Sequence, residues 1–167
     1  MNGTPWMDFA NALIGVKEIP GSKHNPEILQ MWKDIKRSGI KDDETPWCAG
    51  FVGACLERAG IKSSRLESSR SYANFGVNLD KPAYGAIAVY SRKSSNGWGG
   101  HVGFVVGVNL DGSLRVLGGN QQDSVNVSSF RRSPTLRLIA LRYPEGYTAQ
   151  ELLANDTQVA PDSTKQV

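Results

Sequence analysis

The order of two hydrophobic patterns along the chain constrains its fold more than any other feature. The first 60 residues carry apolar side chains at helical spacing. The later segments 86–90, 102–108, 114–117 and 136–141 are short β-branched runs separated by Gly, Asn and Asp, which is typical of strands. Helices followed by strands predict an α+β domain, in which an antiparallel sheet packs against the N-terminal helices.

Three helices are expected in the first part of the chain, over residues 5–14, 26–37 and 46–59. Thr45 is the expected cap of the third helix, and Pro46 suits its first position. This third helix is the one whose sequence suggests chemistry.

The chain becomes polar from residue 144 onward. We therefore expect one folded domain over residues 1–143 and a loose tail over residues 144–167, with one short helix around residues 149–154.

Composition limits the classes of protein that fit. A chain of 167 residues with a net charge of +3 suits one domain and an anionic polymer as partner, and it does not indicate nucleic acid binding. Residues 1–10 lack the pattern of a signal peptide, and no apolar run approaches the ~20 residues of a membrane span. We expect a monomer that is made in the cytoplasm and does not insert stably into a membrane.

Cys48 is placed where reactive cysteines are found. It stands in the first turn of the third expected helix, where free backbone N–H groups and the helix dipole favour a thiolate. Phe51, Val52 and Cys55 share its face of the helix, so the alternative is that Cys48 is a small core residue. Cys55 has no activating feature, and we expect it to be a core residue. The two cysteines lie too far apart on one helix for a disulfide.

Three acidic residues, Asp42, Asp43 and Glu44, precede this helix. Nearby carboxylates raise the pKa of a thiol, which counts against activation of Cys48. They suit a solvated cap or, as a weaker alternative, part of a Ca²⁺ site without the regular ligand spacing of a calcium loop. We expect no cofactor and no metal.

His101 follows a glycine loop and opens the strand-like run 102–108, so it is placed to face a cleft. Asp111-Gly112 predicts a hairpin with a two-residue turn, in which Leu110 pairs with Ser113.

The same register continues to His101. Gln122 then lies opposite His101, and Asn120 lies diagonally across from it on the same face, within reach of its side chain. Gln121 and Asp123 would face the other way, although a one-residue bulge would invert this assignment. Asn120 is therefore the predicted partner of the imidazole, with Gln122 second.

Such a set of residues suits amide hydrolysis. The imidazole takes the thiol proton, the thiolate attacks an amide carbonyl, and the polar partner fixes the tautomer of the imidazole. The backbone N–H of Cys48 is placed to donate to the resulting oxyanion.

Three ordered motifs, at residues 46–52, 100–105 and 117–121, resemble those of the CHAP and NlpC-type cell-wall hydrolases, over roughly residues 6–142. The resemblance implies a papain-like fold and a cysteine peptidase or amidase that cuts amide bonds in peptidoglycan. It implies Cys48 as nucleophile, His101 as base and Asn120 as the third residue. Many CHAP enzymes have an acidic residue near this third position, whereas Gly118 and Gly119 stand beside it here.

The residues expected to contact substrate are Trp47, Trp98 and Gln122. For the two tryptophans, which flank Cys48 and His101, ordinary packing is the alternative.

The resemblance implies an N-acetylmuramoyl-L-alanine amidase or a peptide-stem endopeptidase. We expect a bacteriolytic phage endolysin that reaches the periplasmic wall through a holin, or else an injected toxin of the same fold. Two alternatives stay open: an intracellular or injected cysteine peptidase or acyltransferase, and a wall-binding module without activity.

Overall fold

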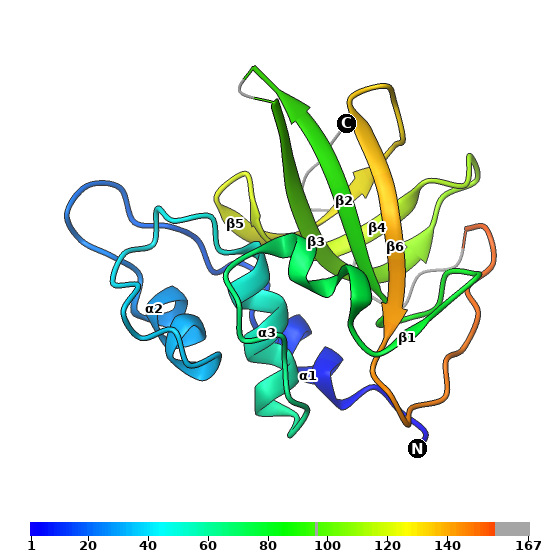
Figure 1. Cartoon of the computed structure of the whole chain (residues 1–167), viewed down its shortest axis with the longest axis horizontal. Helices are drawn as coiled ribbons and strands as arrows, with labels where there is room; N and C mark the ends of the chain where they lie inside the picture. Colours follow the sequence, from blue (N-terminus) through cyan, green and yellow to red (C-terminus); the bar gives the residue numbers. More distant parts are fainter. Residues whose placement is uncertain (96, 156–167) are drawn as a thin grey trace.

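The computed structural model of the protein describes residues 1–95 and 97–155, and it confirms the α+β class (Figure 1). The helices are α1 (Pro5–Ala12), α2 (Pro26–Asp34), α3 (Cys48–Arg58) and the 3₁₀ helix η1 (Ser69–Asn74). The strands are β1 (Val77–Asn78), β2 (Ile87–Ser94), β3 (Gly97–Val108), β4 (Leu114–Gln121), β5 (Ser124–Phe130) and β6 (Leu136–Tyr143).

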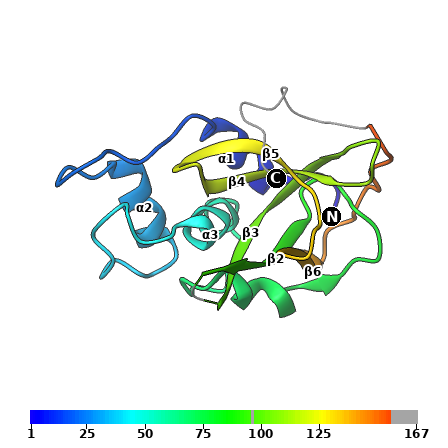
Figure 2. The ribbon, with the colours of Figure 1, turned by 90° about the horizontal axis from the view of Figure 1, so that it is seen from above.

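The six strands form one antiparallel sheet in the order β1-β6-β2-β3-β4-β5. Helix α3 packs against β3 and β4, and α1 and α2 pack against α3. Figures 1 and 2 show these three helices gathered on one side of the sheet. The papain-like arrangement expected from the motifs, with a cysteine-bearing helix on an antiparallel sheet, is confirmed.

Helix α3 begins two residues later than expected, at Cys48 itself. The carboxylate of Asp42 accepts hydrogen bonds from the backbone N–H groups of Glu44 and Thr45, at 3.0 and 2.6 Å. These bonds hold the chain in a turn, so neither Thr45 nor Pro46 joins the helix. The thiol therefore lies at the first residue of α3, where the N–H groups have no partner within the helix.

A glycine on β4 allows the close approach of α3 to the sheet. A Cβ atom built on Gly119 would lie 2.7 Å from Cβ of Phe51 and 2.7 Å from the ring of Trp47. Only a residue without a side chain fits there. The first turn of α3 is thereby brought against the end of β4.

Strand β5 was not expected, because its serines and Asn126 are also typical of loops, although its alternation of polar and apolar residues is that of a strand. Its outer edge is covered by the segment after α1, through hydrogen bonds of the Val125 N–H and C=O groups with Val16 and Gly15. This covering limits the exposed edge.

The described part of the expected tail is folded onto the domain. Leu152 is buried and donates its N–H to the carbonyl of Pro82, while the N–H of Thr148 bonds to the carbonyl of Met1. No helix forms over residues 149–154, where Glu151 instead pairs with Ala83 as an isolated β-bridge. The packing thus continues past residue 143, and residues 156–167 lie outside the described part. No helix within residues 1–95 and 97–155 has the length and hydrophobicity to cross a membrane.

Candidate active site

The turn of the β3–β4 hairpin differs from the two-residue turn expected at Asp111-Gly112. Asn109 pairs with Ser113 around a three-residue loop, in which Gly112 has a φ of 83°. A glycine in this left-handed conformation is the usual solution for a three-residue hairpin loop. The register is therefore one residue away from the expected one already at the turn.

Two further irregularities change which side chain faces His101. The pairing of β3 with β4 shifts between Val105 and Gly107, and the pairing of β4 with β5 shifts between Gly118 and Gln121. Asn120 lies within this second irregularity, with a φ of 56°. The prediction that Asn120 bonds to His101 and that Gln121 faces away was therefore wrong.

Gln121 is the side chain that contacts the imidazole. Its Oε1 lies 2.9 Å from Nε2 of His101, and both side chains are buried. Its Nε2 donates to the carbonyls of Val116 and Asn126 at 3.2 and 2.9 Å, which fixes the orientation of the amide. Because Oε1 can only accept, a neutral His101 carries its proton on Nε2 and presents an unprotonated Nδ1.

A second buried amide supports Gln121. Asn126 of β5 accepts from Nε2 of Gln121 at 3.0 Å and donates to the hydroxyl of Ser124, while Ser128 donates to its Oδ1. These buried polar groups satisfy one another, so the network is rigid. Strand β5 was missed in the sequence, and Asn126 was missed with it.

The His101 ring lies in an apolar setting. It stacks on Phe130 with the ring centres 5.1 Å apart and the planes at 11°. Burial lowers the pKa of His101 to about 4, and the hydrogen bond that the imidazole donates to Gln121 only partly offsets this effect. The imidazole is therefore neutral at pH 7, which is the form that accepts a proton.

The Cys48 thiol is also buried, with 6% of the residue exposed. Burial raises its pKa, and hydrogen bonds from the backbone N–H groups of Val102, Ala49 and Cys48 itself act in the opposite direction. Cys55 lies deeper in the core, where burial raises its pKa with less compensation. The core position expected for Cys55 agrees with its complete burial.

The backbone of β3 connects the surroundings of Cys48 and His101. The N–H of Val102, the residue that follows His101, acts to lower the pKa of the Cys48 thiol. Within residues 1–95 and 97–155, no hydrogen bond joins the thiol and the imidazole directly. Catalytic hydrogen bonds are often long in a free enzyme and shorten when substrate binds.

The three residues expected to contact substrate lie in different environments. Trp47 is fully buried and donates to Glu18 at 2.8 Å, so packing explains it and the prediction that it lines a cleft was wrong. Trp98 is 39% exposed near the start of β3, where the guanidinium of Arg137 lies 4.1 Å from its ring centre. Gln122 is exposed in the β4–β5 turn with a φ of 54°.

The acidic residues before α3 are held by the backbone. Asp43 is fully buried and accepts from the N–H groups of Ile19 and Asn25, at 2.8 and 2.9 Å, and its other oxygen lies 3.1 Å from Nδ1 of His24. Burial opposes ionisation, yet these hydrogen bonds lower the pKa of Asp43. No cluster of three or more His, Cys, Asp or Glu side chains suited to a metal occurs in the described part of the chain.

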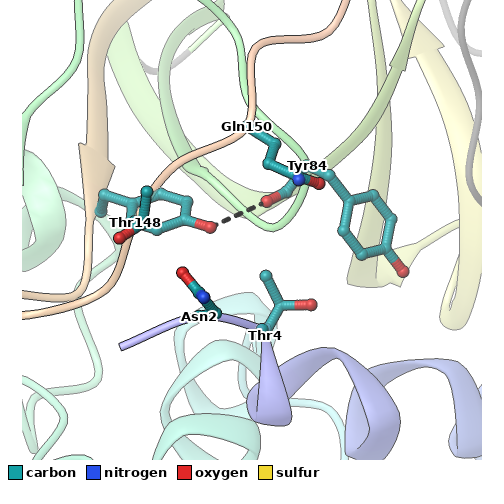
Figure 3. Close-up of a pocket in the computed structure, with 7 residues that line it drawn as sticks. Asn2, Thr4, Tyr84, Thr148 and Gln150 are labelled. Atoms are coloured by element: carbon teal, nitrogen blue, oxygen red, sulfur yellow. Dashed lines mark hydrogen bonds between the residues drawn. The ribbon is translucent and has the colours of Figure 1, made fainter.

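A separate hollow of about 430 Å³ lies beside the N-terminus (Figure 3). Its lining is uncharged and includes Asn2, Thr4, Tyr84, Thr148 and Gln150. None of its lining residues belongs to the network around Gln121, so we treat it as distinct from the Cys48–His101 region.

In this structure a helix begins at a cysteine and packs on an antiparallel sheet, and the sheet carries a histidine with an amide partner. Papain-like cysteine hydrolases have this arrangement. Residues 40–120 match the family model of the CHAP domain, which confirms the resemblance over this segment. CHAP domains are generally hydrolases that act on peptidoglycan, so the match indicates an amidase or peptidase of this class. No curated protein and no solved structure matches the chain.

Proposed function

We propose that the protein is a cysteine-dependent peptidoglycan hydrolase, with Cys48 as nucleophile, His101 as general base and Gln121 as the residue that positions the imidazole. One observation carries the proposal. The hydrogen bond between Nε2 of His101 and Oε1 of Gln121 leaves Nδ1 as the basic nitrogen.

The neutral states of both groups define the first step. Nδ1 of His101 takes the thiol proton as the sulfur of Cys48 attacks the carbonyl carbon of the scissile amide, and the carbonyl π electrons move to oxygen. The C–N bond then breaks, the imidazolium gives its proton to the leaving amine, and a thioester remains. Water attacks the thioester and gives a proton to Nδ1, the C–S bond breaks, and the thiol is restored with that proton.

The start of α3 supplies a donor for the negative oxygen of the tetrahedral intermediate. Cys48 is the first residue of the helix, so its backbone N–H has no partner in the preceding turn. A fixed backbone donor at this position stabilises charge that develops only in the transition state.

Purified protein incubated with cell-wall sacculi tests the proposal. The wild-type protein is expected to solubilise sacculi, and the Cys48→Ala variant is expected to be inactive. Cys55→Ala is the matched control, because it removes a buried thiol from the same helix and leaves the proposed nucleophile in place. Full activity of Cys48→Ala would contradict the mechanism.

The proposed hydrolase activity leaves two candidate bonds in peptidoglycan. Cleavage is proposed at the lactyl–alanine amide or within the peptide stem, and mass spectrometry of the released fragments distinguishes the two.

We also propose the role of a phage endolysin. Expression inside a bacterium is then expected to cause lysis when a holin opens the membrane, and not without it.

A further inference from the structure

Beyond the assignment of Cys48 and His101, one basic residue near His101 has a guanidinium without a hydrogen-bond or ion-pair partner in the described part of the chain. We infer that Arg92 binds a carboxylate of the substrate next to the scissile amide, so that the enzyme selects anionic peptides. This inference rests on the proposed function, because it needs the substrate to occupy the Cys48–His101 region.

The pairing of β2 with β3 places Arg92 near the imidazole. Tyr90 of β2 lies directly opposite His101, and Arg92 is two residues further along β2. Residues two apart on a strand share a face, and diagonal neighbours across two strands lie within side-chain reach. Arg92 is therefore a diagonal neighbour of His101 on the same face of the sheet.

The ring of Phe130 connects the two side chains. The guanidinium carbon of Arg92 lies 5.6 Å from the centre of this ring, and His101 stacks on the same ring. Tyr90 also packs against it, with the ring centres 4.9 Å apart. The aromatic contacts hold the guanidinium close to the base while its polar edge stays accessible.

The charge of Arg92 reaches both reacting groups. Burial raises the pKa of Cys48 and lowers the pKa of His101, and the positive charge of Arg92 contributes a lowering to each. An anionic group bound at Arg92 would thus lie within electrostatic range of the thiol and of the imidazole.

Among the described residues, the Arg92 guanidinium contacts the Phe130 ring but has no hydrogen-bond or ion-pair partner. Its side chain is exposed, and no hydrogen bond or ion pair involves it within the described residues 1–95 and 97–155. By contrast, Arg131 pairs with Asp111, and the neighbouring Arg70 donates to Ser91 and to the carbonyl of Gly99. A free guanidinium presents a planar set of donors that matches a carboxylate with two parallel hydrogen bonds.

Peptidoglycan stems offer a suitable group, because an acidic residue lies near the sugar-linked end. The carboxyl group of this residue that is outside the peptide linkage occurs either as the free, ionised acid or as the amide. The ionised form gives charge-assisted hydrogen bonds with a guanidinium, and the amidated form cannot. The predicted selectivity is therefore for stems that carry the free acid.

The test uses two purified stem fragments that contain the same scissile amide and D-glutamate with either a free or an amidated α-carboxyl group. For the wild-type protein, kcat/KM is expected to be roughly tenfold to a hundredfold higher for the free acid. Arg92→Gln is expected to remove this preference through KM, with little change for the amidated fragment. Arg92→Lys is expected to keep part of the preference, since it retains the charge but not the planar fork.

Lys93→Gln is the matched control. Lys93 is the next residue of β2 and carries the same charge, but its side chain leaves the strand on the opposite face. This variant is expected to keep the wild-type preference. Binding of both fragments to Cys48→Ala, measured by calorimetry, gives a readout without turnover and is expected to show the same preference.

Several outcomes would overturn the inference. Equal rates of the wild-type protein on the two fragments would do so, as would an equal loss on both fragments in Arg92→Gln accompanied by a shifted pH–rate profile. The second result would mean that Arg92 only adjusts the ionisation of the reacting groups. Activity without any preference leaves the proposed function intact, whereas the absence of activity on either fragment and on sacculi contradicts the proposed function itself.

Discussion

The amide oxygen of Gln121 lies 2.9 Å from Nε2 of His101, and the amide nitrogen of the same side chain is bound by Val116 and Asn126. The glutamine is therefore unable to flip without losing buried hydrogen bonds. This single contact determines which nitrogen of the imidazole is basic, and several measurable consequences follow from it and from the packing around it.

Removal of the Gln121 side chain is expected to lower kcat by about 10²-fold on a soluble stem fragment, because the tautomer and the ring orientation of His101 are no longer held. Gln121→Glu is expected to move the acid limb of the pH–rate profile to higher pH, since a carboxylate stabilises the imidazolium. Gln150→Ala, at an exposed glutamine outside the Cys48–His101 region, serves as control and is expected to keep its kcat. Wild-type turnover by Gln121→Ala would show that the contact has no part in catalysis.

The buried neutral state of His101 is expected to make stability fall as the pH falls from about 6.5 to about 4. The folded-state pKa of about 4 is below the unfolded value of 6.5, so the unfolded chain binds a proton in this range and the folded protein does not. The loss amounts to roughly 3 kcal/mol for a shift of this size. Urea unfolding at pH 7 and at pH 4.5 measures most of this loss, roughly 2.4 kcal/mol.

The His101→Gln variant isolates this contribution, because all other titrating groups are kept. Its stability is expected to depend less on pH than that of the wild-type protein between these two values. If the free energy of unfolding fell equally for the two proteins between pH 7 and pH 4.5, the burial of neutral His101 would not be the cause of the loss.

The close approach of α3 and β4 predicts that Gly119→Ala destabilises the protein by about 1–3 kcal/mol, since the new methyl group overlaps Phe51 and Trp47. Gly39→Ala is the control, because a Cβ there meets nothing within 4 Å and the backbone needs no positive φ. Thermal unfolding compares the two variants. Equal melting temperatures would mean that the helix moves away from the sheet at little cost.

The buried carboxylate of Asp43 predicts that Asp43→Ala costs about 3 kcal/mol, because the N–H groups of Ile19 and Asn25 then lose their acceptor. Glu145→Ala removes an exposed carboxylate and is expected to change stability by less than about 0.5 kcal/mol. Urea unfolding at pH 7 measures both variants. A similar small effect for both would indicate that water replaces the Asp43 side chain.

The sequence predicted the elements that hydrophobic spacing alone specifies. The three helices, four of the six strands and the position of Cys48 at a helix start follow from side-chain periodicity and from Pro and Gly at helix ends. Strand β5 was missed because its inward polar residues, Asn126 and Ser128, serve a hydrogen-bond network and not an apolar core. Periodicity carries no information about such a network.

The partner of His101 was mispredicted for a related reason. Side chains alternate along a strand, so each one-residue shift exchanges the two faces. The three-residue turn at residues 110–112 and the shifts at Val105 and Asn120 depend on backbone conformations that a sequence pattern does not report. The motif still located the right strand, and the error was a single position, from Asn120 to Gln121.

The contacts of Met1 have a practical consequence for building larger proteins. Met1 bonds to the backbone of Gly146 and Thr148, at the edge of the molecule opposite to the end of α3 where the chain arrives from α2 (Figure 1). A wall-targeting module joined at Met1 would therefore attach beside residues 146–148 and away from the start of α3. A chimera of this kind keeps the added module clear of the first turn of α3.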